Sequence, residues 1–273
     1  MNNIVLPKKV TFTPSKEKNS GQVVIEPCYP GYGTTLGNGI RRVLLSSLPG
    51  AAVIGVKIKN ASHEFTTIDG VKEDVLEIIL NLKQLRLKVF EPTEDEIIKL
   101  ELKASGVKKV TADDITKNSK VKIASKDLHI LEITDKKTEV ELEIFIMHGY
   151  GYLPIEGREH QEKEVGYIDI DAVFSPVKVV KVEIENVRVG KMTNWDKLVI
   201  NIKTDGTIDF KEAFQEVTKI LVEQFSFLLE QSVEAPADKP KKKKSDKKEK
   251  KQKEEDDESS DDESVTDKEN ENK

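Results

Sequence analysis

Two short stretches of the sequence combine residue types that could bind a small ligand. In the first, four glycines from Gly31 to Gly39 extend from a turn after a predicted strand into the start of a predicted helix. This order is typical of loops that hold anions on free backbone amides at a helix N-terminus. In the second, Asp169 and Asp171 alternate on a predicted strand, so both carboxylates could face one cation. The first stretch lacks the lysine of a phosphate-binding loop, and the second lacks a third ligand.

Other signs of catalysis are missing from the sequence. The four histidines are scattered, and none stands four residues from another. His129 alternates within a predicted strand, which is more typical of a half-buried structural residue than of a base. The residue patterns therefore indicate binding surfaces. A stand-alone α+β enzyme or ligand-binding protein that uses the segment Gly31 to Gly39 as an anion site remains the alternative.

The glycine segment leads into a predicted helix over residues 35–48. Thr34 or Thr35 is expected to cap it. One face carries the apolar side chains, and the other carries Arg41, Leu45 and Ser46. Gly37 and Gly39 each cost about 1 kcal/mol inside a helix, so we expect something to approach the backbone closely there.

A second, longer helix is predicted from residue 209 onward. Asp209 and Glu212 have the spacing of a capping box, and a broad apolar stripe follows over about 30 Å. The stripe is wider than a lone helix on one sheet needs, which favours a dimer through this face. Burial by the helix's own domain is the other interpretation.

In most of the remaining chain up to about residue 232, apolar and polar residues alternate as they do in β-strands. One further helix is predicted over 69–82, with Glu73 and Asp74 in its first turn, and a single helical turn over 111–114. Predicted strands cover 21–27, 51–60, several short runs within 85–146, 165–173, 177–189 and 198–203. This pattern predicts an α+β fold with half-solvated antiparallel sheets.

Composition separates a globular part from a charged tail. Of the 273 residues, 34% are charged, and lysine-rich and acidic blocks are concentrated in 234–273. Such blocks bury too little apolar surface to offset chain entropy, so we predict a disordered charged tail. Cys28 is the only cysteine, and the N-terminus lacks a signal-peptide pattern. We expect a cytoplasmic protein.

Several long motifs resemble one known family. The segment LGNGIRRVLLSSLPGAAV (36–53) looks like the signature of the N-terminal domain of the bacterial RNA polymerase alpha subunit family. Further segments agree in order: HEFTTIDGVKEDVLEIILNLK (63–83), VTADDIT (110–116), GYGYLP (149–154), IDAVFSPV (170–177) and WDKLVINIKTDGTIDFKEA (195–213). The resemblance covers about residues 5–231.

The resemblance implies a two-part architecture and a role in assembly. It predicts a dimerisation subdomain of helices packed on an antiparallel sheet, from 1–50 plus 175–233, and an inserted β-rich subdomain from 51–174. It implies a homodimer on which the beta and beta-prime subunits assemble for transcription. DNA would be reached only through the assembled enzyme. The catalytic magnesium would lie in the large subunits, so no cofactor and no catalytic residue is expected in this chain.

The resemblance also implies residue roles. Contacts to the large subunits are expected at Arg41, Arg42, Leu45, Ser46 and Lys197, with Arg42 foremost, and further contacts at Gly149 to Pro154 and Ser175 to Val177. The dimer interface is expected at Leu36, Ile40, Val43, Leu44, Phe214, Val217, Leu221, Phe225 and Leu228.

The C-terminus departs from the family pattern. Residues 234–273 show no apolar period that could build the usual DNA-binding C-terminal domain. Two interpretations of the tail remain: it is a solvated linker, or its lysines bind DNA phosphates weakly and in a salt-sensitive way. A platform subunit of an archaeal or eukaryotic polymerase, which would form a heterodimer, is the remaining related alternative.

Overall fold

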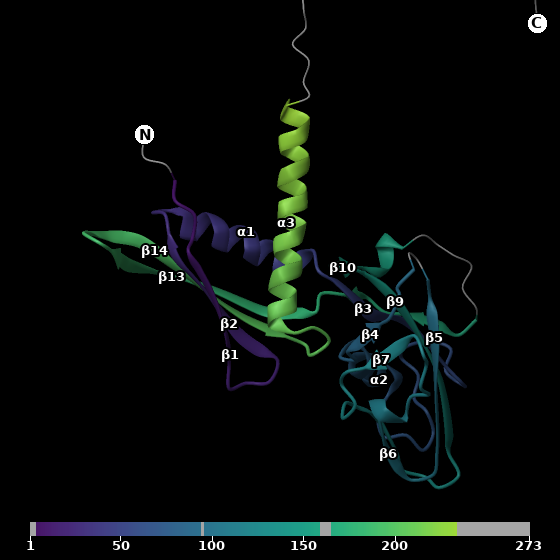
Figure 1. Ribbon diagram of the computed structural model, residues 1–273. Helices are drawn as coiled ribbons and strands as arrows, with labels where there is room; N and C mark the ends of the chain where they lie inside the picture. Colours follow the sequence, from purple (N-terminus) through teal and green to yellow (C-terminus); the bar gives the residue numbers. More distant parts are fainter. Residues whose placement is uncertain (1–3, 94–95, 159–164, 234–273) are drawn as a thin grey trace, which may run out of the picture. The chain divides into compact units, whose positions relative to one another are not determined.

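The computed structural model of the chain describes residues 4–93, 96–158 and 165–233 (Figure 1). The predicted disordered tail, 234–273, lies outside these described residues. The predicted α+β class with antiparallel sheets is confirmed. Among the described residues, no helix is both long and apolar enough to cross a membrane.

The first sheet joins the two ends of the globular part. Its strand order is β1-β2-β14-β13, and every neighbouring pair is antiparallel. Figure 1 shows the purple strands from the start of the chain beside the green strands from its end. The strands are β1 (Lys9–Pro14), β2 (Ser20–Cys28), β13 (Val177–Val189) and β14 (Met192–Thr204).

Two helices cover one face of this sheet. They are α1 (Tyr32–Ser46) and α3 (Phe210–Val233), and their buried side chains share one hydrophobic cluster with the sheet. Phe214 of α3 packs edge-to-face on Phe12 of β1, with ring centroids 5.6 Å apart. Only the first half of α3 is buried, because every described side chain from Val222 onward is exposed.

The second sheet forms the middle of the chain around its own hydrophobic cluster. Its order is β5-β9-β3-β4-β7, and β11 pairs with β3. Two ribbons, β6-β8 and β10-β12, accompany it, and α2 (Val75–Lys83) packs on β3 and β8. The strands are β3 (Pro49–Ile58), β4 (Leu87–Val89), β5 (Ile98–Ser105), β6 (Lys108–Thr111), β7 (Val121–Ile123), β8 (His129–Ile133), β9 (Glu139–Tyr150), β10 (Tyr152–Leu153), β11 (Tyr167–Asp169) and β12 (Ala172–Val173).

The helical turns of the middle region are short. The turn predicted over 111–114 is present as η1 (Ala112–Asp114), and Thr111 and Asp114 form its capping box. A second turn, η2 (Ile155–Gly157), follows β10.

Two predicted helix starts are wrong. The first helix begins at Tyr32, and its N-cap is Gly31 with φ 86°, so neither Thr34 nor Thr35 caps it. The helix expected from residue 69 begins at Val75, where the Asp74 side chain accepts the backbone N–H of Glu77. Gly70, with φ 79°, lies in a turn before this helix.

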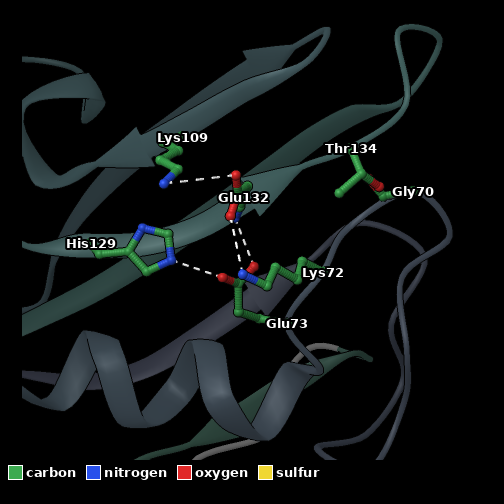
Figure 2. A network of polar contacts seen from close by, with 7 residues as sticks. All are labelled: Gly70, Lys72, Glu73, Lys109, His129, Glu132 and Thr134. Carbon is green, nitrogen blue, oxygen red and sulfur yellow. Dashed lines mark hydrogen bonds and ion pairs between the residues drawn. The ribbon is translucent and has the colours of Figure 1, made fainter.

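Glu73 precedes α2 and joins a polar network instead of the helix (Figure 2). Glu73 as a residue is 6% exposed, its Oε1 lies 2.8 Å from His129 Nε2, and its Oε2 accepts the Glu132 backbone N–H at 2.7 Å. Burial by itself raises the pKa of Glu73, but these hydrogen bonds outweigh it and hold the pKa below its usual range. The network fixes the entry to α2 against β8.

A candidate protein-docking surface

The N-terminus of α1 does bind a carboxylate, but the carboxylate belongs to the same chain. Oδ2 of Asp196 accepts the backbone N–H groups of Gly31 at 2.9 Å and of Gly33 at 3.0 Å. Asp196 is 8% exposed, so it occupies the position an external anion would need. The alternative of an anion site on the Gly31 to Gly39 segment is therefore wrong.

The expected close approach to the helix glycines is confirmed at one of the two. A Cβ atom on Gly37 would lie 2.8 Å from Val182 Cγ1 and 2.9 Å from Leu198 Cδ1, closer than side chains pack. The close neighbour is thus the chain's own sheet. Gly39 has no atom within 4 Å of its Cβ position, so this chain gives no steric reason for that glycine.

The outer face of α1 carries the predicted arginines. Arg41, Arg42 and Ser46 are exposed, and Leu45 is 38% exposed. The Ser46 hydroxyl donates to the Arg42 carbonyl at 2.9 Å. Within the described ranges neither guanidinium group forms an ion pair, so both keep their donors for another molecule.

Two distant segments lie beside the end of this face. The Cβ position of Gly151 is 3.4 Å from the Ser46 carbonyl oxygen, and the Gly151 carbonyl accepts the Phe174 backbone N–H at 2.9 Å. Tyr150 and Tyr152, on either side of Gly151, are 64% and 59% exposed. The predicted contact segment 149–154 therefore adjoins the end of α1, and Phe174, which directly precedes the predicted segment 175–177, is hydrogen-bonded to it.

We call this composite patch the docking surface, and its members are Arg41, Arg42, Leu45, Ser46, Tyr150 and Tyr152. Exposed arginine and tyrosine beside an apolar side chain is the composition typical of protein–protein interfaces. The two tyrosines belong to the sequence motif GYGYLP. In the sequence, only the glycine between them, Gly151, indicated the sharp turn that the structure shows there, where its φ is 62°.

Lys197 lies apart from this surface. Asp196 and Leu198 both face α1, so Lys197 between them points to the opposite face of the sheet. There its Nζ lies 2.8 Å from Glu185 Oε2, and this hydrogen bond raises the pKa of Lys197. A contact through Lys197 would therefore use a different face of the chain.

The predicted dimer residues divide into buried and exposed groups. Ile40, Leu44, Phe214 and Val217 are at most 8% exposed and pack in the core of their own chain. Leu36, Val43 and Leu221 are half-buried against the same core. Only Phe225 and Leu228 are exposed, at 65% and 61%, together with Val222, Phe227 and Leu229. The free apolar surface is thus the second half of α3.

Each carboxylate of the Asp169 and Asp171 pair contacts a basic side chain of the same chain. Asp171 accepts a hydrogen bond from Lys83 Nζ at 3.2 Å and another from the Ile155 backbone N–H at 3.2 Å. Asp169 Oδ1 lies 3.7 Å from Arg158 Nη1. In the part of the chain that the structure describes, no three histidine, cysteine or acidic side chains are grouped to hold a metal ion.

Comparisons with known proteins agree with the motifs. Residues 56–175 match the family described as the RNA polymerase Rpb3/RpoA insert domain. A DNA-directed RNA polymerase subunit alpha of Oceanobacillus iheyensis is 43% identical to this chain over 235 residues. The alignment covers 86% of this chain and 74% of that protein. The chain belongs to the family of the DNA-directed RNA polymerase subunit alpha.

Proposed function

We propose that this chain is the non-catalytic assembly subunit of a bacterial RNA polymerase. It acts as a homodimer that binds the beta and beta-prime subunits, which carry the catalytic magnesium, and it meets DNA through the assembled enzyme in the cytoplasm. The family relationship supports this role. The observation that carries it is the docking surface, where unpaired arginines, exposed tyrosines and Leu45 from separate segments adjoin.

The two hydrophobic clusters support the proposed division of the chain into two subdomains. One cluster takes its residues from Val23–Leu48 and Val177–Val217, and the other from Ala51–Ile170. The first corresponds to the dimerisation subdomain proposed for 1–50 plus 175–233, and the second to the insert proposed for 51–174. The docking surface draws on both, so docking would depend on each of them.

The exposed half of α3 supports the homodimer. Five large apolar side chains between Val222 and Leu229 are 58% to 66% exposed. Leaving such side chains in water forgoes roughly 1.5 to 3 kcal/mol each, which a second copy of the helix would recover.

Affinity purification of the tagged full chain from its own cells tests the proposal. We expect mass spectrometry to identify two large polymerase subunits in the eluate. Arg42→Ala should lower their recovery on the order of tenfold, because exposed arginines of this kind are frequent interface hot spots. Light scattering should give the same mass for the purified variant as for the parent chain.

Arg188→Ala is the matched control, because Arg188 is also exposed but lies on β13, outside the docking surface. Full recovery of the large subunits with Arg42→Ala would contradict the docking role. Equal losses with both variants would show that arginine removal acts generally, and would contradict it as well.

A further inference from the structure

The insert region holds a small apolar pocket that the proposed function does not use. Its volume is about 320 Å³, near the lower end of the roughly 300–1,000 Å³ typical of ligand pockets. Leu100, Ile115, Val121 and Ile123 supply aliphatic lining, and Phe90 stands beside them with 46% of its surface exposed. The pocket therefore suits one bulky apolar group.

Lysines surround this pocket. Lys117, Lys122 and Lys126 line it, and among the lining residues that the structure describes Asp113 is the only acid. Lys126 lies 3.5 Å from that acid, whereas no ion pair involves Lys117 or Lys122 within the described ranges. The described lining residues thus carry more positive than negative charge.

The strand register adds a further unpaired lysine. Lys88 of β4 stands directly opposite Lys122 of β7, and both side chains are exposed. Like charges in directly opposite positions destabilise a sheet. In the parts of the chain described by the structure, Lys88 too has no ion pair. Both lysines lie on the face of these strands opposite Val121 and Ile123, so an acidic ligand that passes over the edge strand β7 would relieve the repulsion.

We propose that this pocket is a docking site for an acidic peptide segment of another protein, with one bulky apolar side chain in the pocket and flanking carboxylates on the lysines. The apolar group supplies affinity by leaving water, and the carboxylates supply orientation and a faster encounter. The site is separate from the docking surface of α1, so an assembled polymerase could still present it to a regulatory protein.

A single-stranded nucleic acid is the main competing occupant. It would use phosphates on the lysines and a base stacked on Phe90. The aliphatic lining favours a peptide, because a base prefers aromatic platforms.

Fluorescence polarisation with the full chain tests the site. The probe is a labelled synthetic peptide in which one tryptophan is flanked on both sides by aspartates. We expect binding that weakens about tenfold or more in Lys117→Glu/Lys122→Glu, and also in Phe90→Ala, which removes a side chain that is 46% exposed. Replacing the tryptophan of the peptide by alanine, or its aspartates by asparagines, should weaken binding to a similar degree.

Matched control variants separate this site from general attraction to lysine. Lys136→Glu/Lys137→Glu reverses two exposed lysines in the turn before β9, and Phe65→Ala removes a phenylalanine that is 75% exposed elsewhere. Both should bind the peptide within about twofold of the parent chain. Equal weakening by these controls, or equal binding of the tryptophan-free peptide, would overturn the proposal. Stronger binding of oligothymidylate than of the peptide, lost in the pocket variants, would overturn it in favour of nucleic acid.

Discussion

Gly37 of α1 lies directly against Val182 of β13, so closely that a Cβ atom on the glycine would come within 2.8 Å of Cγ1 of the valine. Real side chains do not pack at that distance. Since this contact sets how near α1 approaches the sheet, it also places the outer face of the helix, with Arg41 and Arg42, relative to the segments that complete the docking surface.

Gly37→Ala should destabilise the chain, whereas Gly39→Ala should stabilise it. Alanine gains about 1 kcal/mol over glycine inside a helix, but overpacking against Val182 costs roughly 1 to 3 kcal/mol. Gly39 has open space at its Cβ position, so there only the gain remains. Urea denaturation at one fixed protein concentration measures both, because a dimer's stability depends on concentration. Stabilisation by both substitutions would show that α1 can move away from the sheet at little cost.

Asp196→Ala should cost about 0.5 to 2 kcal/mol of unfolding free energy, the usual range for removing a helix cap. The substitution leaves the amides of Gly31 and Gly33 without their buried acceptor. Asp196→Asn keeps a side-chain oxygen in the same place but loses the negative charge, which is favourable at a helix N-terminus. Its unfolding free energy should therefore lie between those of Asp196→Ala and the parent chain. Thermal unfolding followed by circular dichroism ranks the stabilities of the three proteins. An asparagine variant as stable as the parent would show that the charge contributes nothing.

Glu73→Gln should reduce stability at neutral pH and flatten its dependence on acid. The folded pKa of Glu73 is lowered, so its stabilising effect is complete above the unfolded pKa of about 4.3 and is lost as pH falls through the folded pKa. We expect a loss of about 1 to 3 kcal/mol at pH 7, because a buried hydrogen-bonded charge is removed. As the pH falls through the lowered folded pKa of Glu73, the stabilities of the two chains should converge. Glu139→Gln, at an exposed strand end, is the control, and parallel stability curves for Glu73→Gln and the parent would refute this role.

Elements with an uninterrupted local period were predictable. The strand Val177–Val189 and the helix that begins at Phe210 have the expected bounds, because alternation in one and a capping box with an apolar stripe in the other are local signals. The outer face of α1 was predictable for the same reason, since helical spacing separates Arg41 from Ile40 and Leu44.

Features that depend on distant residues were not predictable. The acceptor that caps α1 is Asp196, 165 residues away from Gly31, whereas Thr34 and Thr35 lie inside the helix and do not cap it. The late start of α2 follows from Glu73, whose partners His129 and Glu132 are 56 and 59 residues away. The burial of Phe214 in its own core likewise depends on Phe12, at the other end of the chain.

Phe225→Asp and Leu228→Asp should each yield a folded monomer, whereas Phe214→Asp should unfold the chain. Phe225 and Leu228 are exposed in the single chain, so a charge there meets water, whereas burying that charge in the proposed dimer costs several kcal/mol. Phe214 is 8% exposed and packs on Phe12, so the same change would place a charge in the chain's own core. Light scattering reports the mass, and circular dichroism reports the fold. Glu223→Lys, an exposed position on the same helix, should leave both unchanged. If Phe225→Asp and Leu228→Asp remain dimers, the dimer interface does not lie on this half of α3. Its apolar face would then be the contact surface for a different partner.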